Sequence, residues 1–139
     1  MSVAERGIHM SKKKLLFICV ENAGRSQMAQ GFAEALTKGR LEIYSAGSRP
    51  SSHINPLVIE VMKEKGTDLS GRQPKGLSDL PPIEMDYLIT MGCEEICPAV
   101  PAKKIIEWNI PDPKGKPIDE IRMIRDMLEA KVKKLLEEV

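Results

Sequence analysis

Four short apolar runs alternate with stretches of helical spacing, and this alternation constrains the fold of the 139-residue chain more than any other feature. The runs expected to form strands are residues 14–20, 41–45, 86–91 and 103–108. The first run is almost continuously apolar, which is typical of a strand buried on both faces of a parallel sheet. Strands separated by helices require right-handed crossovers, which place helices on both faces. The pattern therefore predicts one three-layer α/β domain with a four-stranded parallel sheet.

The expected helices have clear start and stop signals. One runs from Arg25 to Lys38 and is stopped by Gly39, and a second opens at Asn55-Pro56 and ends near Gly66. A third begins at about Ile118 and continues toward the C-terminus. Because no repeat or interdomain linker is visible, we expect residues 11–139 to form a single catalytic domain. Residues 1–10 read as an N-terminal extension or expression remnant.

Composition excludes several classes of partner. The 21 basic and 20 acidic side chains leave a net charge of +1, and aromatic residues make up only 4% of the chain. Nucleic-acid binding needs a basic surface and stacking platforms, so we expect no nucleic-acid partner. No apolar run approaches the roughly 20 residues of a membrane span, so we expect no membrane association. Three cysteines and no visible signal peptide predict a reducing, cytoplasmic location.

Three reactive side chains follow predicted strands. Cys19 ends the first strand, Cys93 comes just after the third, and Asp112 follows the fourth. In parallel α/β sheets, ligands bind at the carboxyl ends of the strands. These residues are therefore expected to meet at one site.

The segment from Cys19 to Ser26 joins a buried strand to a helix start. Such a loop can direct its backbone N–H groups at a tetrahedral oxyanion, and the helix dipole adds positive potential. Arg25 offers a planar fork that matches two oxygens of the anion. The same field favours the thiolate of Cys19, which is the nucleophilic form, and Ser26 could donate to it or cap the helix.

The other candidates carry protons or electrons. Asp112, between two prolines, is placed to protonate a departing oxygen, although it could equally be a turn residue. Cys93 and Cys97 could form a disulfide that supplies two electrons, or be two unrelated buried thiols. A structural zinc site needs four ligands, and only His9 and His53 could join the cysteines, so no metal is expected.

Four motifs together resemble the low-molecular-weight tyrosine phosphatase superfamily. The stretch Cys19-Val-Glu-Asn-Ala-Gly-Arg-Ser-Gln-Met-Ala resembles the active-site loop of its arsenate reductase branch. Tyr44-Ser-Ala-Gly resembles the second-strand motif, and Trp108-Asn-Ile-Pro-Asp-Pro the acid loop. Met91-Gly-Cys-Glu-Glu-Ile-Cys-Pro resembles the redox loop of the reductases. The motifs occur in the family's order from Lys14 onward, and the resemblance implies the strand order 2-1-3-4.

The resemblance implies a thioredoxin-type arsenate reductase. Cys19 would attack arsenate, Asp112 would protonate the leaving hydroxide, and a disulfide would pass from Cys19–Cys93 to Cys93–Cys97. Thioredoxin, glutathione or a similar thiol would be the reductant, phosphate and sulfate would compete with arsenate, and no cofactor is implied. The residues expected to bind the oxyanion or support the loop are Glu21, Asn22, Ala23, Gly24, Ser26 and Ser45.

Two other functions stay open at this point. A phosphatase hydrolysing phosphate monoesters would turn over without Cys93 and without a thiol reductant. However, the family's tyrosine phosphatases usually have an aromatic residue where this chain has Lys114, which argues against an aryl phosphate substrate. A non-hydrolytic cysteine phosphoryl carrier would also place a cysteine at a strand end, but Arg25 and the loop of Asp112 count against it.

Overall fold

The computed structural model describes residues 12–92 and 100–139. The strands β1 (Lys14–Cys19), β2 (Glu42–Gly47), β3 (Met85–Thr90) and β4 (Ala102–Glu107) form one sheet. All neighbouring strands are parallel, and their order is β2-β1-β3-β4. The predicted sheet and its strand order are confirmed. The segment 1–10, expected to be an extension, lies outside the described residues.

Parallel pairing brings the carboxyl ends of the strands to one edge. Cys19 pairs with Gly47 in the β1–β2 register. Just past β3, the Met91 N–H donates to the Ile18 carbonyl over 2.8 Å, and past β4 the Trp108 N–H donates to the Thr90 carbonyl over 2.9 Å. The loops that leave all four strands therefore start side by side.

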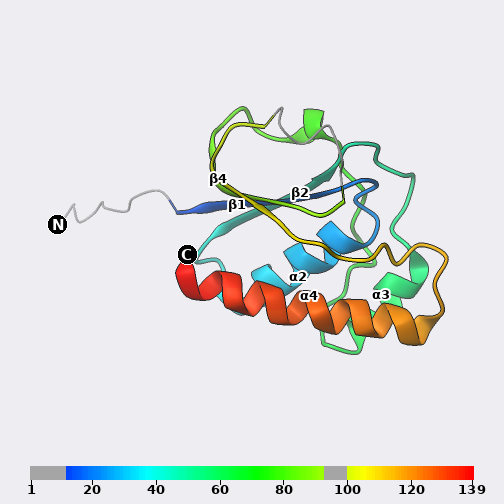
Figure 1. Cartoon of the computed structure of the whole chain (residues 1–139). Helices are drawn as coiled ribbons and strands as arrows, with labels where there is room; N and C mark the ends of the chain where they lie inside the picture. Colours follow the sequence, from blue (N-terminus) through cyan, green and yellow to red (C-terminus); the bar gives the residue numbers. More distant parts are fainter. Residues whose placement is uncertain (1–11, 93–99) are drawn as a thin grey trace.

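Three α-helices lie together on one face of the sheet: α2 (Arg25–Thr37), α3 (Pro56–Lys63) and α4 (Ile118–Glu138) (Figure 1). Together with alternate residues of β1 they bury the larger apolar core. Helix α2 ends where Lys38 and Gly39 take positive φ angles of 50° and 86°. Helix α3 begins at Asn55, whose side chain accepts from the Leu57 N–H over 3.0 Å. All three helices match the predicted ones within a few residues.

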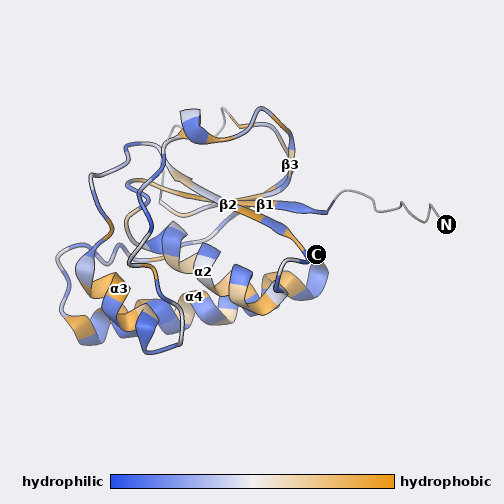
Figure 2. Cartoon of the chain, turned by 180° about the vertical axis from the view of Figure 1, so that it is seen from behind, coloured by the Kyte–Doolittle hydropathy of each residue, from blue (hydrophilic) through white to orange (hydrophobic). Residues whose placement is uncertain are grey.

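The opposite face is covered differently. In the described residues its cover is a connector that carries only a short 3-10 helix, η1 (Leu77–Asp79) (Figures 1 and 2). A smaller apolar cluster lies beneath it, built on Leu16, Ile18 and Leu88. The sequence predicted helices on this face as well. Within the described residues the layer contains only the 3-10 helix η1, because Pro81 and Pro82 lack the N–H groups that a longer helix would need.

A charged clasp fixes α3 against α4. Glu64, just after α3, accepts from Arg122 over 2.8 Å and from Arg125 over 2.6 Å. These hydrogen bonds lower the pKa of Glu64 to about 2, so the clasp is charged throughout the neutral range. Arg125 also donates to the Val61 carbonyl over 3.0 Å. The C-terminal end of α3 is thereby held against α4. No helix in the described part of the chain is long and apolar enough to cross a bilayer.

Candidate active site

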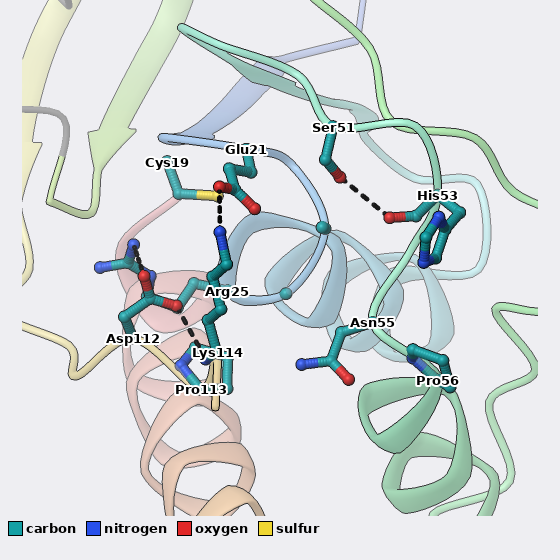
Figure 3. Close-up of a pocket in the computed structure, with 12 residues that line it drawn as sticks. Cys19, Glu21, Arg25, Ser51, His53, Asn55, Pro56, Asp112, Pro113 and Lys114 are labelled. Carbon is teal, nitrogen blue, oxygen red and sulfur yellow. Dashed lines mark hydrogen bonds and ion pairs between the residues drawn. The ribbon is translucent and has the colours of Figure 1, made fainter. Parts of the chain in front are cut away.

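A pocket of about 310 Å³ opens at the carboxyl edge of the sheet (Figure 3). Its walls come from three segments, which follow β1, β2 and β4. The lining residues are Cys19, Glu21, Ala23, Gly24, Arg25, Ser51, His53, Asn55, Pro56, Asp112, Pro113 and Lys114. Of the three residues predicted to meet here, Cys19 and Asp112 both line the pocket, together with Arg25, whereas Cys93 lies outside the described residues.

The oxyanion loop, residues 19–25, turns its carbonyl groups away from the pocket. Four of these carbonyls accept from backbone N–H groups of the segment 48–55, at 2.7–3.2 Å; the donors are Ser48, Arg49, Ser51 and Asn55. The N–H groups of residues 21–24 donate to no acceptor among the described residues. With its carbonyls tied outward, the loop leaves a nest of N–H groups at the start of α2, which suits a tetrahedral anion.

Cys19 lies on the pocket floor beside a hydroxyl donor. Its side chain is buried, and Sγ lies 2.9 Å from Ser26 Oγ. Ser26 Oγ in turn accepts from Asn22 Nδ2 over 2.6 Å, which leaves its own hydrogen free to point at the sulfur. A donor aimed at sulfur stabilises the thiolate. Of the two roles predicted for Ser26, the structure favours the one toward the thiol, since Gly24 is the N-cap of α2.

Asn22 is the centre of the loop's support. It is fully buried and has a φ of 52°, a left-handed conformation that Asn tolerates better than most residues. Its amide donates to Ser45 Oγ over 3.1 Å as well as to Ser26. Its carbonyl accepts from Gln27 Nε2 over 2.9 Å and from the Lys75 N–H over 2.8 Å. Four partners, three side chains and one backbone N–H, are thus held by one residue.

Glycine is required behind this loop. A Cβ on Gly47 would lie 2.6 Å from the Val20 carbonyl oxygen and 2.8 Å from the Asn22 nitrogen. Both are backbone atoms, so neither can give way cheaply. The second-strand motif therefore ends in Gly47 because the oxyanion loop packs directly on it.

Arg25 links the oxyanion loop to the acid loop, residues 110–114. Its buried guanidinium donates to the Ile110 carbonyl over 3.1 Å, and its Nη2 lies 3.5 Å from Asp112 Oδ2. The other carboxylate oxygen of Asp112 accepts from the Lys114 N–H over 3.0 Å. Asp112 is 55% exposed and stands over the pocket (Figure 3). Asp112 is thus paired with the guanidinium of Arg25, the same group that a bound oxyanion would contact.

Gly92 approaches the same guanidinium. It has a φ of 79°, and a Cβ there would overlap Arg25 Nη1, so only glycine fits. The predicted redox residues Cys93 and Cys97 follow Gly92 in sequence but lie outside the described residues. Their roles stay predictions.

Some pocket residues were missed by sequence reasoning. His53 was expected to be a surface-loop residue, and it is exposed, but it also lines the pocket with Ser51 and Asn55. Gln27 and Gln30 were not named as site residues; they do not line the pocket, yet both are buried in the network that supports it, where Gln30 accepts from Ser45. Polar side chains on an otherwise apolar helix face were the available signal. No group of three or more His, Cys, Asp or Glu within residues 12–92 and 100–139 could hold a metal ion.

The family model for low molecular weight phosphotyrosine protein phosphatase matches residues 14–139. This chain belongs to that family. The match spans the sheet, all three α-helices and the pocket, so the resemblance seen in the four motifs is confirmed.

The chain is 38% identical to a putative arsenate reductase of Halobacterium salinarum. The alignment covers 92% of this chain and 94% of that protein. A solved thioredoxin-dependent arsenate reductase of Corynebacterium glutamicum is 35% identical with a TM-score of 0.78, covering 98% of this chain and 66% of that longer one. A solved arsenate reductase in the phosphate binding state is 31% identical with a TM-score of 0.83, over 91% of this chain and 98% of that one.

Proposed function

We propose that this protein is an arsenate reductase, which converts arsenate to arsenite by a cysteine nucleophile and a three-cysteine disulfide relay. The observation that carries the proposal is the buried Cys19 thiol, 2.9 Å from a hydroxyl donor, on the floor of an oxyanion nest. Relatives with 31–38% identity over most of the chain are named arsenate reductases.

In the first step the Cys19 thiolate attacks arsenic and expels one oxygen. Arsenate bound in the loop accepts hydrogen bonds from the guanidinium of Arg25. Arg25 Nη2 then no longer contacts Asp112 Oδ2. Asp112, standing over the pocket, then gives a proton to the departing oxygen, which leaves as water. The product is a Cys19–arsenate thioester, with arsenic still in the +5 state.

In the second step Cys93 attacks the sulfur of Cys19. The S–As bond breaks and its electron pair stays on arsenic, which leaves as arsenite in the +3 state. A Cys19–Cys93 disulfide remains. Gly92, which precedes Cys93 in the sequence, packs on the guanidinium of Arg25. This proximity supports Cys93 as the attacking thiol.

In the third step Cys97 attacks Cys93 and regenerates the Cys19 thiolate. The resulting Cys93–Cys97 disulfide is reduced by an external dithiol, for which thioredoxin is the first choice, since the Corynebacterium relative is named thioredoxin-dependent. Arsenate and two thiols thus give arsenite, a disulfide and water. A reducing cytoplasm suits a cycle that depends on free thiols.

The pocket walls favour a small free anion over an aryl ester. None of the twelve lining residues is Phe, Tyr or Trp, and the acid loop presents Lys114 where an aromatic wall would clasp a phenyl ring. Phosphate and sulfate have the same tetrahedral shape and are expected to compete with arsenate. The phosphatase alternative keeps the same first step but has water, rather than Cys93, attack the covalent intermediate.

Single-turnover chemistry with Cys97→Ser separates these functions. We expect about one arsenite per enzyme and then a stop, with a Cys19–Cys93 link accumulating, because the disulfide cannot move outward. Wild type treated with arsenate in the absence of reductant should instead hold Cys93–Cys97. Peptide mapping of both proteins reads the result.

Three outcomes would count against parts of the proposal. Steady turnover of Cys97→Ser with thioredoxin as sole reductant would remove the third cysteine from the relay. Absence of both disulfide and arsenite, with hydrolysis of a phosphate ester, would replace the reductase by a phosphatase. A stable phosphoryl-cysteine without hydrolysis would indicate a carrier.

A further inference from the structure

One ion pair crosses the mouth of the pocket. Lys114 Nζ lies 2.9 Å from Glu21 Oε2, so the acid loop is tied to the oxyanion loop through two side chains that both line the pocket. Figure 3 shows the Lys114 side chain running from beside Pro113 up to Glu21, past Arg25. Nothing in the three-step reaction above uses this pair.

Lys114 acts at both of its ends. Its backbone N–H donates to Asp112 Oδ1 over 3.0 Å, while its ammonium group holds Glu21. The hydrogen bond that Lys114 donates to Glu21 raises the pKa of Lys114, so its charge persists at neutral pH. Lys114 therefore helps to orient the carboxylate of Asp112 through its backbone, and its side chain reaches across the pocket to Glu21.

The direction in which the leaving oxygen departs gives the Glu21–Lys114 pair a chemical role. Attack from Cys19 on the floor expels the oxygen opposite the sulfur, toward Asp112 and the mouth. In arsenate that oxygen carries only hydrogen. In a phosphate monoester it carries a carbon substituent, which must leave through the opening that the Glu21–Lys114 pair crosses.

We propose that the Glu21–Lys114 ion pair is a specificity strap, which admits unsubstituted tetrahedral oxyanions and disfavours their organic derivatives. Lys114 is here a positioning residue, acting through Glu21 and Asp112. The proposal rests on the proposed function for the identity of the natural substrate, but the selectivity itself is a property of binding and is measured without turnover.

Calorimetric titration with two inert probes tests the strap. Inorganic phosphate stands for the free oxyanion, and phenylphosphonate carries a substituent at one position of the tetrahedron. We expect wild type to prefer phosphate. Lys114→Ala and Glu21→Gln should each reduce that preference by up to about fivefold, as an exposed ion pair permits. The double variant should reduce it no further, and Lys114→Arg should retain it.

The control is Lys116→Ala, which removes the same charge from the same loop without touching Glu21. It should leave the preference unchanged. If Lys114 acts only as a point charge, Lys114→Ala will weaken both probes equally, Glu21→Gln will strengthen both, and the preference will stay constant. That pattern would overturn the strap.

Arsenite release by the same variants keeps the two proposals apart. A protein that makes no arsenite but shows the expected loss of preference retains the strap and loses the reductase assignment. If the wild type makes arsenite but the Lys114 and Glu21 variants keep the preference for phosphate, the reductase assignment stands and the strap is overturned.

Discussion

The two loops that meet over the pocket are held in opposite ways. The oxyanion loop is supported from beneath by neutral hydrogen bonds among fully buried side chains, namely Asn22, Ser26 and Ser45. The acid loop is held by charged contacts at the surface, where the side chains of Asp112 and Lys114 are 55% and 70% exposed. The floor of the site is fixed by the fold, whereas the outer part of its cover, Asp112 to Lys114, is held by exposed charged contacts; deeper in the same loop, Ile110 accepts from the buried Arg25.

This difference separates two tasks. A rigid nest can bind a tetrahedral anion and favour a thiolate without reorganising during the reaction. A cover held by exposed ion pairs, each worth at most about 1 kcal/mol, can exchange partners when the substrate enters. Arg25 stands between them, since it contacts Asp112 here and is proposed to leave it when an oxyanion binds. Variants of floor and cover should therefore fail in different ways.

The largest expected effect is on the floor. Cys19→Ser should abolish arsenite formation, because a serine hydroxyl stays protonated where the thiol ionises. Its thermal unfolding should stay close to that of wild type, since the side chain keeps its size and its contact with Ser26. Arsenite release and a melting curve on the same preparation check both statements. Retained turnover in the purified variant would place the nucleophile elsewhere.

Next comes the acid on the cover. Asp112→Asn keeps the size of the side chain but cannot give a proton, so single-turnover rates should fall by about 100- to 10,000-fold. Phosphate affinity should change far less, because the floor is intact. Asp119→Asn is the matched control, as Asp119 is exposed on α4 and pairs with Arg122, away from the pocket lining. An unchanged rate in Asp112→Asn would remove the acid role from this residue.

Much of the fold was predictable because its signals are local. The apolar run of β1 needs burial on both faces, Asn55-Pro56 starts α3, and Gly39 follows the end of α2; each is visible in a few consecutive residues. The cover of the second face was less visible. The proline-rich connector reads as a loop, and only the structure shows that it closes an apolar cluster.

For the site, the strand ends predicted which residues meet, but not what supports them. Asn22 takes a bond from the backbone of Lys75, 53 residues away, and no spacing rule reveals such a contact. The Glu21–Lys114 pair was not predicted for the same reason, because the two residues are 93 positions apart and were assigned to two separate motifs. Contacts between loops depend on the sheet that brings the loops together.

A third prediction compares the stability of floor and cover. Asn22→Ala should lower the free energy of unfolding by about 2–4 kcal/mol, because it removes the four hydrogen bonds that the buried Asn22 amide makes to Ser26, Ser45, Gln27 and the Lys75 backbone. Asp112→Ala should lower it by less than about 0.5 kcal/mol, since its contacts are exposed. Urea titration of both variants checks the contrast. Asn22→Gly accepts the positive φ, so equal losses in the Gly and Ala variants would assign the cost to the lost hydrogen bonds.

The smallest expected effect is the response of the cover to salt. Raising NaCl from about 50 to about 500 mM shortens the screening length from roughly 13 to 4 Å, which weakens an exposed ion pair such as Glu21–Lys114. Phosphate and phenylphosphonate are both dianions at pH 8, so the general loss of affinity cancels in their ratio. The part of the ratio that still depends on salt comes from the Glu21–Lys114 pair. The preference for phosphate over phenylphosphonate should therefore fall by about twofold at most. In Lys114→Ala the ratio should change much less with salt, because the Glu21–Lys114 pair is absent. Equal salt sensitivity in this variant and in wild type would mean that the selectivity arises on the neutral, buried floor, and the division between a fixed floor and an adjustable cover would then be wrong.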